Sequence, residues 1–375
     1  MSNGKTVTSS QYRLLVAEFI AGSSLLLAYM DRTVQQDAWL VVLVSFAAIL
    51  PILLCYAMLA NRLPGKNLVQ INDAAFGPVF GKLISLLHIG TFLLLFVFNL
   101  NGLADYYVGA VTPEMPKLAL VLITLLVTAY AVAKGAKPIA LFGLLSLVVS
   151  VGVILFTSLL LLKDMDFSNL LPMLESPGNK YLQSAHIFSL TFTGTQVFLM
   201  MTPSLDPGVK FRRNTISGAA IGTVLLLIVS LRNTAVLGPT TALFASNSHM
   251  AVRMISIKDI LTRVELLVVI SVLAALFVRI VIQFYAIITA MTAVFGLKSP
   301  RTLIVPVGGL AAVLSLVAFS STVDSSFAAL RYHAFLPMLV SFILPPVTLL
   351  VLSARQHRFS EAAVDGGGQA DEARR

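Results

Sequence analysis

The sequence predicts an all-α integral membrane protein with about ten transmembrane helices, of which the first and the sixth are interrupted. Hydrophobic residues make up 57% of the 375 residues and charged residues only 11%, which is too little charge to cover a soluble domain. A helix needs roughly 20 apolar residues to cross a bilayer. Ten runs of about that length cover residues 11–30, 38–60, 83–104, 117–133, 138–162, 182–205, 216–237, 264–295, 302–320 and 333–353.

The first span is interrupted near its middle by small and polar residues. Glu18 is followed by Gly22, Ser23 and Ser24 within a run that is otherwise apolar. Irregular backbone at bilayer depth persists only where protein or a water-filled cavity satisfies it. If the helix unwinds here, the freed amides could bind a carboxylate, helped by the positive end of the following half-helix. The alternative is that the small residues only permit close helix packing.

The sixth span carries a second polar break and a polar stripe. His186, Ser189, Thr193 and Gln196 recur at helical spacing, so they share one face that we expect to point to a cavity or the bundle interior. The predicted ligand-binding residues of this span are Ser189, Thr193, Gly194, Thr195 and Gln196. Two breaks five spans apart favour a repeat-built transporter core with one site between the halves. The alternative for the stripe is hydrogen bonding between helices.

Three ionisable residues inside the predicted spans matter most, namely Glu18, Arg232 and Arg279. A charge at this depth requires a partner or water, so each is a candidate functional group. For Glu18 the two interpretations are a buried ion pair with an arginine, or a proton-coupling or amine-binding role. Arg232 and Arg279 are interpreted as residues near span ends whose side chains snorkel to the interface.

Asn101 and Asp105 lie one turn apart near the outer end of the third span. They could gate an outer vestibule. The alternative is a solvated carboxylate within an interfacial aromatic belt, which Tyr106 and Tyr107 would supply.

The basic balance of the chain reflects membrane topology. The chain has 26 Lys and Arg against 17 Asp and Glu, a formal net charge of +9. With a cytoplasmic N-terminus, 16 of these 26 basic residues fall in inner segments, eight in outer segments and two inside spans. The positive-inside rule then predicts that both termini are cytoplasmic, and the charge does not indicate nucleic-acid binding.

The segments outside the spans also carry predictions. Apolar residues at helical spacing in 68–76 predict an amphipathic helix at the inner surface, and 239–262 could include a short lid helix. The polar composition from 355 onward predicts a disordered cytoplasmic tail, so the domains are a transmembrane unit, 1–354, and a tail, 355–375. The histidines lack metal-ligand spacing, and no activated nucleophile is evident. We therefore expect no metal, no cofactor and no enzymatic activity.

Four short motifs in a fixed order resemble a known family. QDAWL at 36–40 opens the second span, NLVQI occurs at 67–71, DFSNLLP occurs at 166–172, and Arg263 and Glu265 precede the eighth span. Together they resemble the GerAB-type B subunits of spore germination receptors. These are grouped with amino-acid permeases in the amino acid–polyamine–organocation superfamily.

The resemblance implies a five-plus-five inverted repeat of the leucine-transporter type, with helices 1 and 6 broken. It also implies recognition of a small germinant, commonly an amino acid. The implied partners are an A-type membrane subunit and a C-type lipoprotein in the spore inner membrane. In this sequence Glu18 occupies a position that is more often neutral in the family.

The leading function is therefore a membrane subunit of a germinant receptor that binds an amino acid between the first and sixth spans. One alternative is a proton- or sodium-coupled amino-acid transporter with Glu18 as the coupling group. Another alternative is a gated water or ion conduit.

Overall fold

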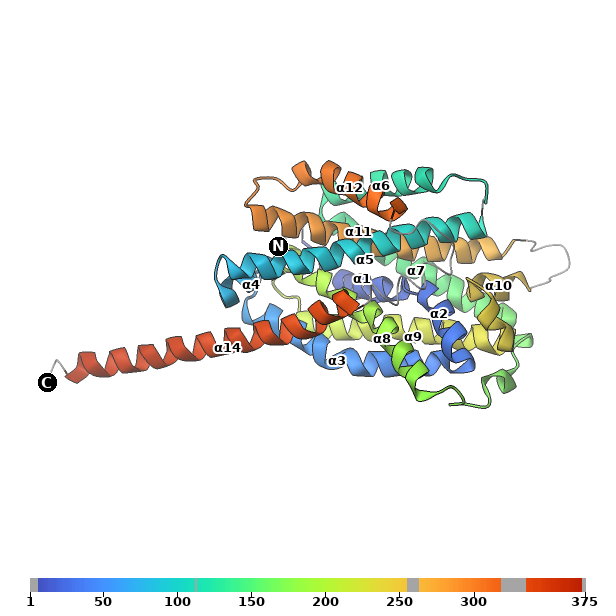
Figure 1. The fold of residues 1–375 in the computed structure, drawn as a ribbon, viewed down its shortest axis with the longest axis horizontal. Helices are drawn as coiled ribbons and strands as arrows, with labels where there is room; N and C mark the ends of the chain where they lie inside the picture. Colours follow the sequence, from blue (N-terminus) through green and yellow to red (C-terminus); the bar gives the residue numbers. More distant parts are fainter. Residues whose placement is uncertain (1–5, 112, 255–262, 318–334, 373–375) are drawn as a thin grey trace.

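The computed structural model describes residues 6–111, 113–254, 263–317 and 335–372, and these form a bundle of helices (Figure 1). The longer helices are α1 (Ser9–Ala21), α2 (Leu25–Val34), α3 (Ala38–Arg62), α4 (Leu68–Phe76), α5 (Phe80–Ala110), α6 (Lys117–Lys134), α7 (Ala136–Leu160), α8 (Gly178–Thr193), α9 (Phe211–Leu237), α10 (Asn247–Arg253), α11 (Glu265–Phe295), α12 (Arg301–Val317) and α14 (Phe335–Glu372). Short 3-10 helices lie between them, including η4 (Gly194–Met200). The predicted all-α class is confirmed.

The described helices are of membrane-spanning character. Seven helical segments in the described part of the chain are long and apolar enough to cross a membrane, and α12 is a shorter apolar helix. The first and sixth predicted spans are each split, into α1 with α2 and into α8 with η4. Each half is too short to cross a bilayer by itself, so no single continuous helix forms either of the two broken spans.

The ends of the bundle are distinguished by two short helices. The predicted amphipathic helix is α4, whose Leu68, Ile71 and Ala75 are buried. The predicted lid helix is α10, at the opposite end of the bundle (Figure 1). We refer to these as the α4 end and the α10 end. The topology prediction assigns the α4 end to the cytoplasm.

Helix α14 continues beyond the predicted last span and projects past the α4 end (Figure 1). Its helical conformation extends to Glu372, and residues 373–375 lie outside the described part of the chain. The division into a transmembrane unit, 1–354, and a disordered tail, 355–375, stays a prediction.

The first break is a tightened turn and not an open segment. Helix α1 begins with a capping box of Thr8 and Gln11 and ends at Gly22. The amide of Gly22 donates to the Glu18 carbonyl at 2.9 Å, that of Ser23 to Ile20 at 3.0 Å, and that of Ser24 to Ala21 at 3.1 Å. These amides are therefore occupied in this conformation, and a ligand could use them only after the turn opens.

Close packing explains the small residue at this break. A Cβ added to Gly22 would lie 2.7 Å from the Ala275 carbonyl oxygen of α11, which is closer than real Cβ contacts allow. On the other side of α1, a Cβ at Gly222 of α9 would lie 2.6 Å from the Ala17 carbonyl oxygen. Small residues thus let α9 and α11 approach α1 closely, as in other membrane helix interfaces.

The second break is a change of helix type. Helix α8 ends at Thr193, and the chain continues as the seven-residue 3-10 helix η4, all of whose residues are buried. Runs of 3-10 helix longer than three or four residues are uncommon and often mark a functional hinge. Both predicted interruptions are present, but they differ in form.

Candidate functional site

A cavity of about 360 Å³ lies beside the first break, toward the α10 end. Its walls come from α2, α5, α8, α10 and α11, together with the segment that precedes α10. Most of the lining is apolar. The polar side chains of the lining include Ser23, Asn99, Asn101, Asp105, His249 and Arg279. A mainly apolar pocket with a few polar groups is the usual form of a small-molecule site.

Arg279 is the cation of this lining that lies deepest in the bundle. It occupies the middle of α11 and is 3% exposed. Its Nη1 donates to the Phe19 carbonyl oxygen at 3.0 Å and to the Ser23 hydroxyl, and its guanidinium lies 4.5 Å from the centre of the Phe19 ring. Its Nε has no hydrogen-bond partner among the described residues. Every partner is neutral, so the positive charge is not balanced by a carboxylate in the described chain.

The prediction that both intramembrane arginines snorkel to the interface is wrong. Arg279 lies near the midpoint of its helix, too far from either end to reach water along it. Arg232 is 4% exposed and donates to the Thr157 hydroxyl at 2.8 Å and to the Asn233 amide oxygen at 2.9 Å. Both are buried, and polar groups accept their hydrogen bonds: for Arg232 these are Thr157 of α7 and Asn233 of its own helix.

Of the two interpretations of Glu18, the ion pair with an arginine is not what the structure shows. Glu18 is fully buried and its Oε1 accepts from the hydroxyls of Ser146 at 2.5 Å and Ser150 at 2.9 Å, both on α7. Its Oε2 has no hydrogen-bond partner among the described residues. Arg279 approaches α1 at Phe19 and Ser23, so the two buried ionisable groups attach this helix to different neighbours.

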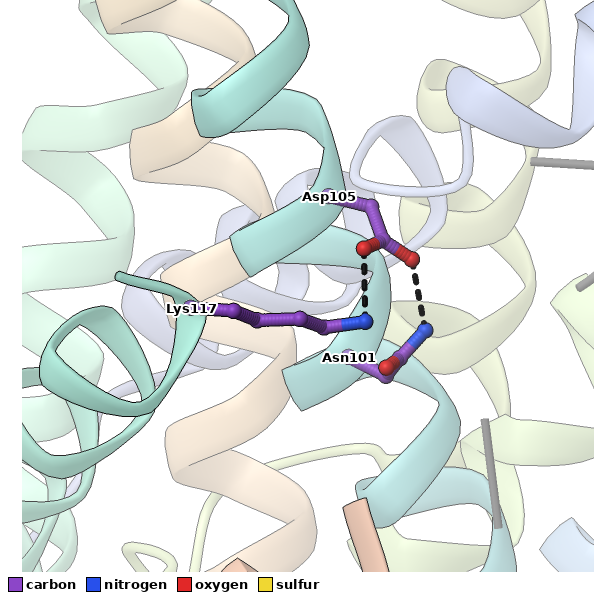
Figure 2. A network of polar contacts seen from close by, with 3 residues as sticks. All are labelled: Asn101, Asp105 and Lys117. Carbon is purple, nitrogen blue, oxygen red and sulfur yellow. Dashed lines mark hydrogen bonds and ion pairs between the residues drawn. The ribbon is translucent and has the colours of Figure 1, made fainter. Parts of the chain in front are cut away.

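A polar network lies where α5 meets the start of α6 (Figure 2). The Lys117 ammonium lies 2.6 Å from Oδ1 of Asp105, and the Asn101 amide donates to Oδ2 of the same carboxylate at 2.7 Å. Asn101 and Asp105 both line the cavity. The carboxylate is ion-paired and not simply solvated. That these residues gate an outer vestibule stays a prediction.

Helix α10 covers the cavity from its own end of the bundle. The Asn247 amide donates to the buried Asp31 carboxylate of α2, which ties α10 to the second half of the broken span. His249 of α10 lines the cavity and is half-buried. Burial lowers the pKa of His249, and the nearby Arg253 charge lowers it further.

The predicted binding residues divide between the two breaks. Gly22 and Ser23 line the cavity, whereas Ser24 lines a separate pocket of about 40 Å³ on the α7 and α9 side. The residue of α8 in the cavity lining is Leu190. None of the five predicted residues of the sixth span appears in that lining, namely Ser189, Thr193, Gly194, Thr195 and Gln196.

The hydroxyls of Ser189 and Thr195 bond to carbonyl oxygens within the sixth span, whereas that of Thr191 has no hydrogen-bond partner among the described residues. Ser189 donates to the Ala185 carbonyl oxygen at 2.7 Å, and Thr195 donates to Phe192 at 2.6 Å. Gln196 accepts from the Ser341 hydroxyl of α14 at 3.5 Å, and neither residue lines the cavity. Their ligand-binding role, like that of Gly22, Ser23 and Ser24, stays a prediction.

The predicted ligand-binding residues did not include Arg279, although its position fifteen residues after the start of the eighth predicted span, 264–295, was a usable signal. No three His, Cys, Asp or Glu side chains cluster in a way that could hold a metal ion within the described ranges. The arrangement is that of a binding site with a buried cation at one wall and an ion-paired carboxylate at another.

In sequence, the chain is similar to known spore germination proteins. A family described as "Spore germination protein" matches residues 6–323. Spore germination protein KB of Bacillus subtilis (strain 168) is 22% identical over 332 residues, which is 86% of each chain. Spore germination protein YndE of the same organism is 21% identical over 260 residues, covering 68% of this chain and 67% of that protein.

Solved transporters share the fold. Mhp1, a nucleobase-cation-symport-1 family transporter with bromovinylhydantoin bound, superposes with a TM-score of 0.70 at 14% identity, covering 93% of this chain and 80% of that one. MhsT in complex with L-phenylalanine gives 0.59 at 15% identity, covering 93% and 99%. These confirm the predicted leucine-transporter type of fold and a multi-pass membrane protein. The family model is one of spore germination proteins, and the fold is that of solved transporters.

Proposed function

Because the chain belongs to the spore germination protein family, we propose that it is the ligand-binding membrane subunit of a germinant receptor. The ligand is a small apolar α-amino acid that occupies the cavity beside the first break. Binding shifts a conformational equilibrium at that break, which partner subunits detect. The proposed partners are an A-type membrane subunit and a C-type lipoprotein, and the proposed location is the spore inner membrane with both termini cytoplasmic.

The observation that carries this proposal is Arg279. A buried charge without a counter-ion costs several kcal/mol, so a site that retains one is suited to an anionic ligand. Arginine also presents a planar donor array that matches a carboxylate. Bound there, a ligand carboxylate would compensate the charge and compete with the Phe19 carbonyl and Ser23 hydroxyl for the guanidinium, both of which belong to the first broken span.

The rest of the cavity supports an apolar side chain on the ligand. Leu95, Phe98, Leu190 and Leu276 are among the lining residues. At about 360 Å³ the cavity lies within the range of small-molecule sites. That MhsT, of the same fold, was solved with L-phenylalanine is consistent with an amino-acid ligand.

The experiment is calorimetric titration of L-leucine into the purified full chain in lipid nanodiscs. We expect saturable binding to the natural protein and a loss of about tenfold to hundredfold in affinity for Arg279→Gln, because a charge-assisted hydrogen bond is worth about 1.5–3 kcal/mol. Arg279→Lys keeps the charge without the planar fork and should bind with intermediate affinity. Equal affinity for all three proteins would contradict the proposal.

A secondary amino-acid transporter is the second candidate, and the shared transporter fold together with the buried Glu18 favours it. Reconstituted vesicles with labelled L-leucine distinguish the two. A receptor binds without accumulation under a proton or sodium gradient, whereas gradient-driven accumulation that Glu18→Gln removes would establish a coupled transporter.

A further inference from the structure

Asp105 already binds an ammonium group, and that group belongs to the protein. The Lys117 Nζ lies 2.6 Å from Oδ1 of Asp105, while Asn101 holds Oδ2 at 2.7 Å (Figure 2). Asp105 and Asn101 line the cavity, and Lys117 is absent from its lining. The carboxylate therefore faces the cavity and is occupied by a cation that reaches it from the start of α6.

Asp105 and Arg279 lie at similar depth in the bundle. Helices α5 and α11 run side by side in opposite directions (Figure 1). The Asn99 amide of α5 donates to the Gln283 amide oxygen of α11 at 3.0 Å, which fixes one common level. At 1.5 Å of rise per residue, Arg279 lies roughly 6 Å and Asp105 roughly 9 Å from that level, both toward the α10 end. A cation and an anion thus face the same cavity at nearly the same height.

This pairing matches the two ends of an amino acid. The inference rests on the proposed function, in which Arg279 receives the ligand carboxylate. We propose that Asp105 is the site for the ligand ammonium, and that Lys117 is a built-in substitute which occupies this site until the ligand displaces it.

The ion pair is suited to exchange. The side chains of Lys117 and Asp105 are each 26% exposed. Ion pairs that are partly solvated contribute little net stability, so their replacement by a chemically identical pair costs little. Asn101 keeps Asp105 oriented whichever ammonium is present, because it bonds to the other carboxylate oxygen.

Displacement of Lys117 would also carry a signal. Lys117 is the first residue of α6, directly after Pro116, and its ion pair joins that end of α6 to α5. Helix α6 packs against α5, α11 and α12. A ligand that takes Asp105 releases this connection, so occupancy of the cavity is transmitted to α6 and its neighbours.

The first test compares three probes in nanodiscs by calorimetry. L-leucine has both charged groups, 4-methylpentanoate lacks the ammonium, and 3-methylbutylamine lacks the carboxylate. For Asp105→Asn, an isosteric change that retains a partner for Asn101, we expect L-leucine affinity to fall at least tenfold while that of 4-methylpentanoate is unchanged.

For Lys117→Met we expect L-leucine to bind about tenfold more tightly, because the competing ammonium is gone. The double variant should match Asp105→Asn.

The outcomes separate this inference from the proposed function. If Arg279→Gln weakens both L-leucine and 4-methylpentanoate but Asp105→Asn changes neither, the proposed function stands and the inference is wrong. If L-leucine does not bind the natural protein at all, both are contradicted.

A second test needs no variant that might fail to fold. An amine-acylating reagent is applied to the natural protein, and modification of Lys117 is followed by mass spectrometry. L-leucine should raise the labelling rate of Lys117 severalfold, whereas 4-methylpentanoate should not, since it cannot replace the ammonium. Lys134, which lies over the Tyr130 ring at the other end of α6, is the internal control. An unchanged rate at Lys117 under saturating L-leucine would overturn the proposal.

Discussion

The two broken spans look alike in sequence and differ in what their breaks face. At the first break, the residues around Gly22 and Ser23 line a cavity and receive a buried arginine from α11. At the second, the chain passes from α8 into η4, and the hydroxyls of Ser189 and Thr195 bond to carbonyls of their own helix. Side-chain hydroxyls that bond to nearby backbone carbonyls, as those of Ser189 and Thr195 do, are satisfied without a ligand.

The largest expected effect comes from filling the first break. Gly22→Ala places a methyl group 2.7 Å from a backbone oxygen of α11, which cannot move aside alone. We expect a destabilisation of about 1–3 kcal/mol, as for other overpacked sites, together with loss of L-leucine binding. Thermal unfolding in detergent and calorimetry measure the two effects. If the Gly22→Ala variant melted at the same temperature as the natural protein, α1 and α11 would not be packed as described.

The same substitution at the second break is the matched comparison. A methyl group at Gly194 would lie 3.3 Å from carbon atoms of the Phe19 ring, a side chain that can shift by a few tenths of an ångström. It would also lie 3.5 Å from Nη2 of Arg279, which is an ordinary van der Waals contact. We expect Gly194→Ala to cost less than about 1 kcal/mol and to reduce L-leucine affinity no more than threefold. If Gly194→Ala were as damaging as Gly22→Ala, the two breaks would be equally constrained and the contrast would fail.

Removal of one hydroxyl at the first break should have a moderate effect. The Ser23 hydroxyl accepts from the Arg279 guanidinium, so Ser23→Ala leaves that charge with one fewer partner. We expect a change of about 1.5–3 kcal/mol in unfolding free energy, the range for hydrogen bonds to charged groups. Urea or thermal unfolding of the purified variant checks it, and Ser23→Thr, which restores an acceptor, should recover most of the loss.

The smallest effect is expected for the equivalent change in the sixth span. Ser189 donates to carbonyls of its own helix, and such back-bonding adds little or slightly destabilises. Ser189→Ala should therefore alter the unfolding free energy by less than about 0.5 kcal/mol and leave L-leucine affinity unchanged. A tenfold loss of affinity for Ser189→Ala would place the sixth-span stripe at the ligand after all.

The fold was largely predictable because it depends on long apolar runs and on breaks that are visible locally. The lengths of the runs gave the spans, and Gly22 and Gly194 marked the interruptions at the residues where helix geometry changes. Helix α10, predicted as a possible lid, and the amphipathic helix α4 also followed from local pattern.

The site was harder to predict because it depends on contacts between distant segments. Arg279 acts through Phe19 and Ser23, which lie 260 and 256 residues away in the chain. Glu18 bonds to serines of α7 instead of an arginine, since helix rotation decides which neighbour each side faces. The spacing of residues within one span shows which side chains share a face, but it does not show which neighbouring helix that face contacts.

The most direct test of the account is to find where the ligand touches the chain. A photoreactive diazirine analogue of leucine is bound to the full-length protein in nanodiscs, activated by light, and mapped by mass spectrometry of the modified peptides. The account predicts competable labelling in α5 between Leu95 and Tyr106 and in α11 near Leu276, the walls of the cavity at the first break. Labelling confined to η4, Gly194–Met200, with none in α5 or α11, would contradict it.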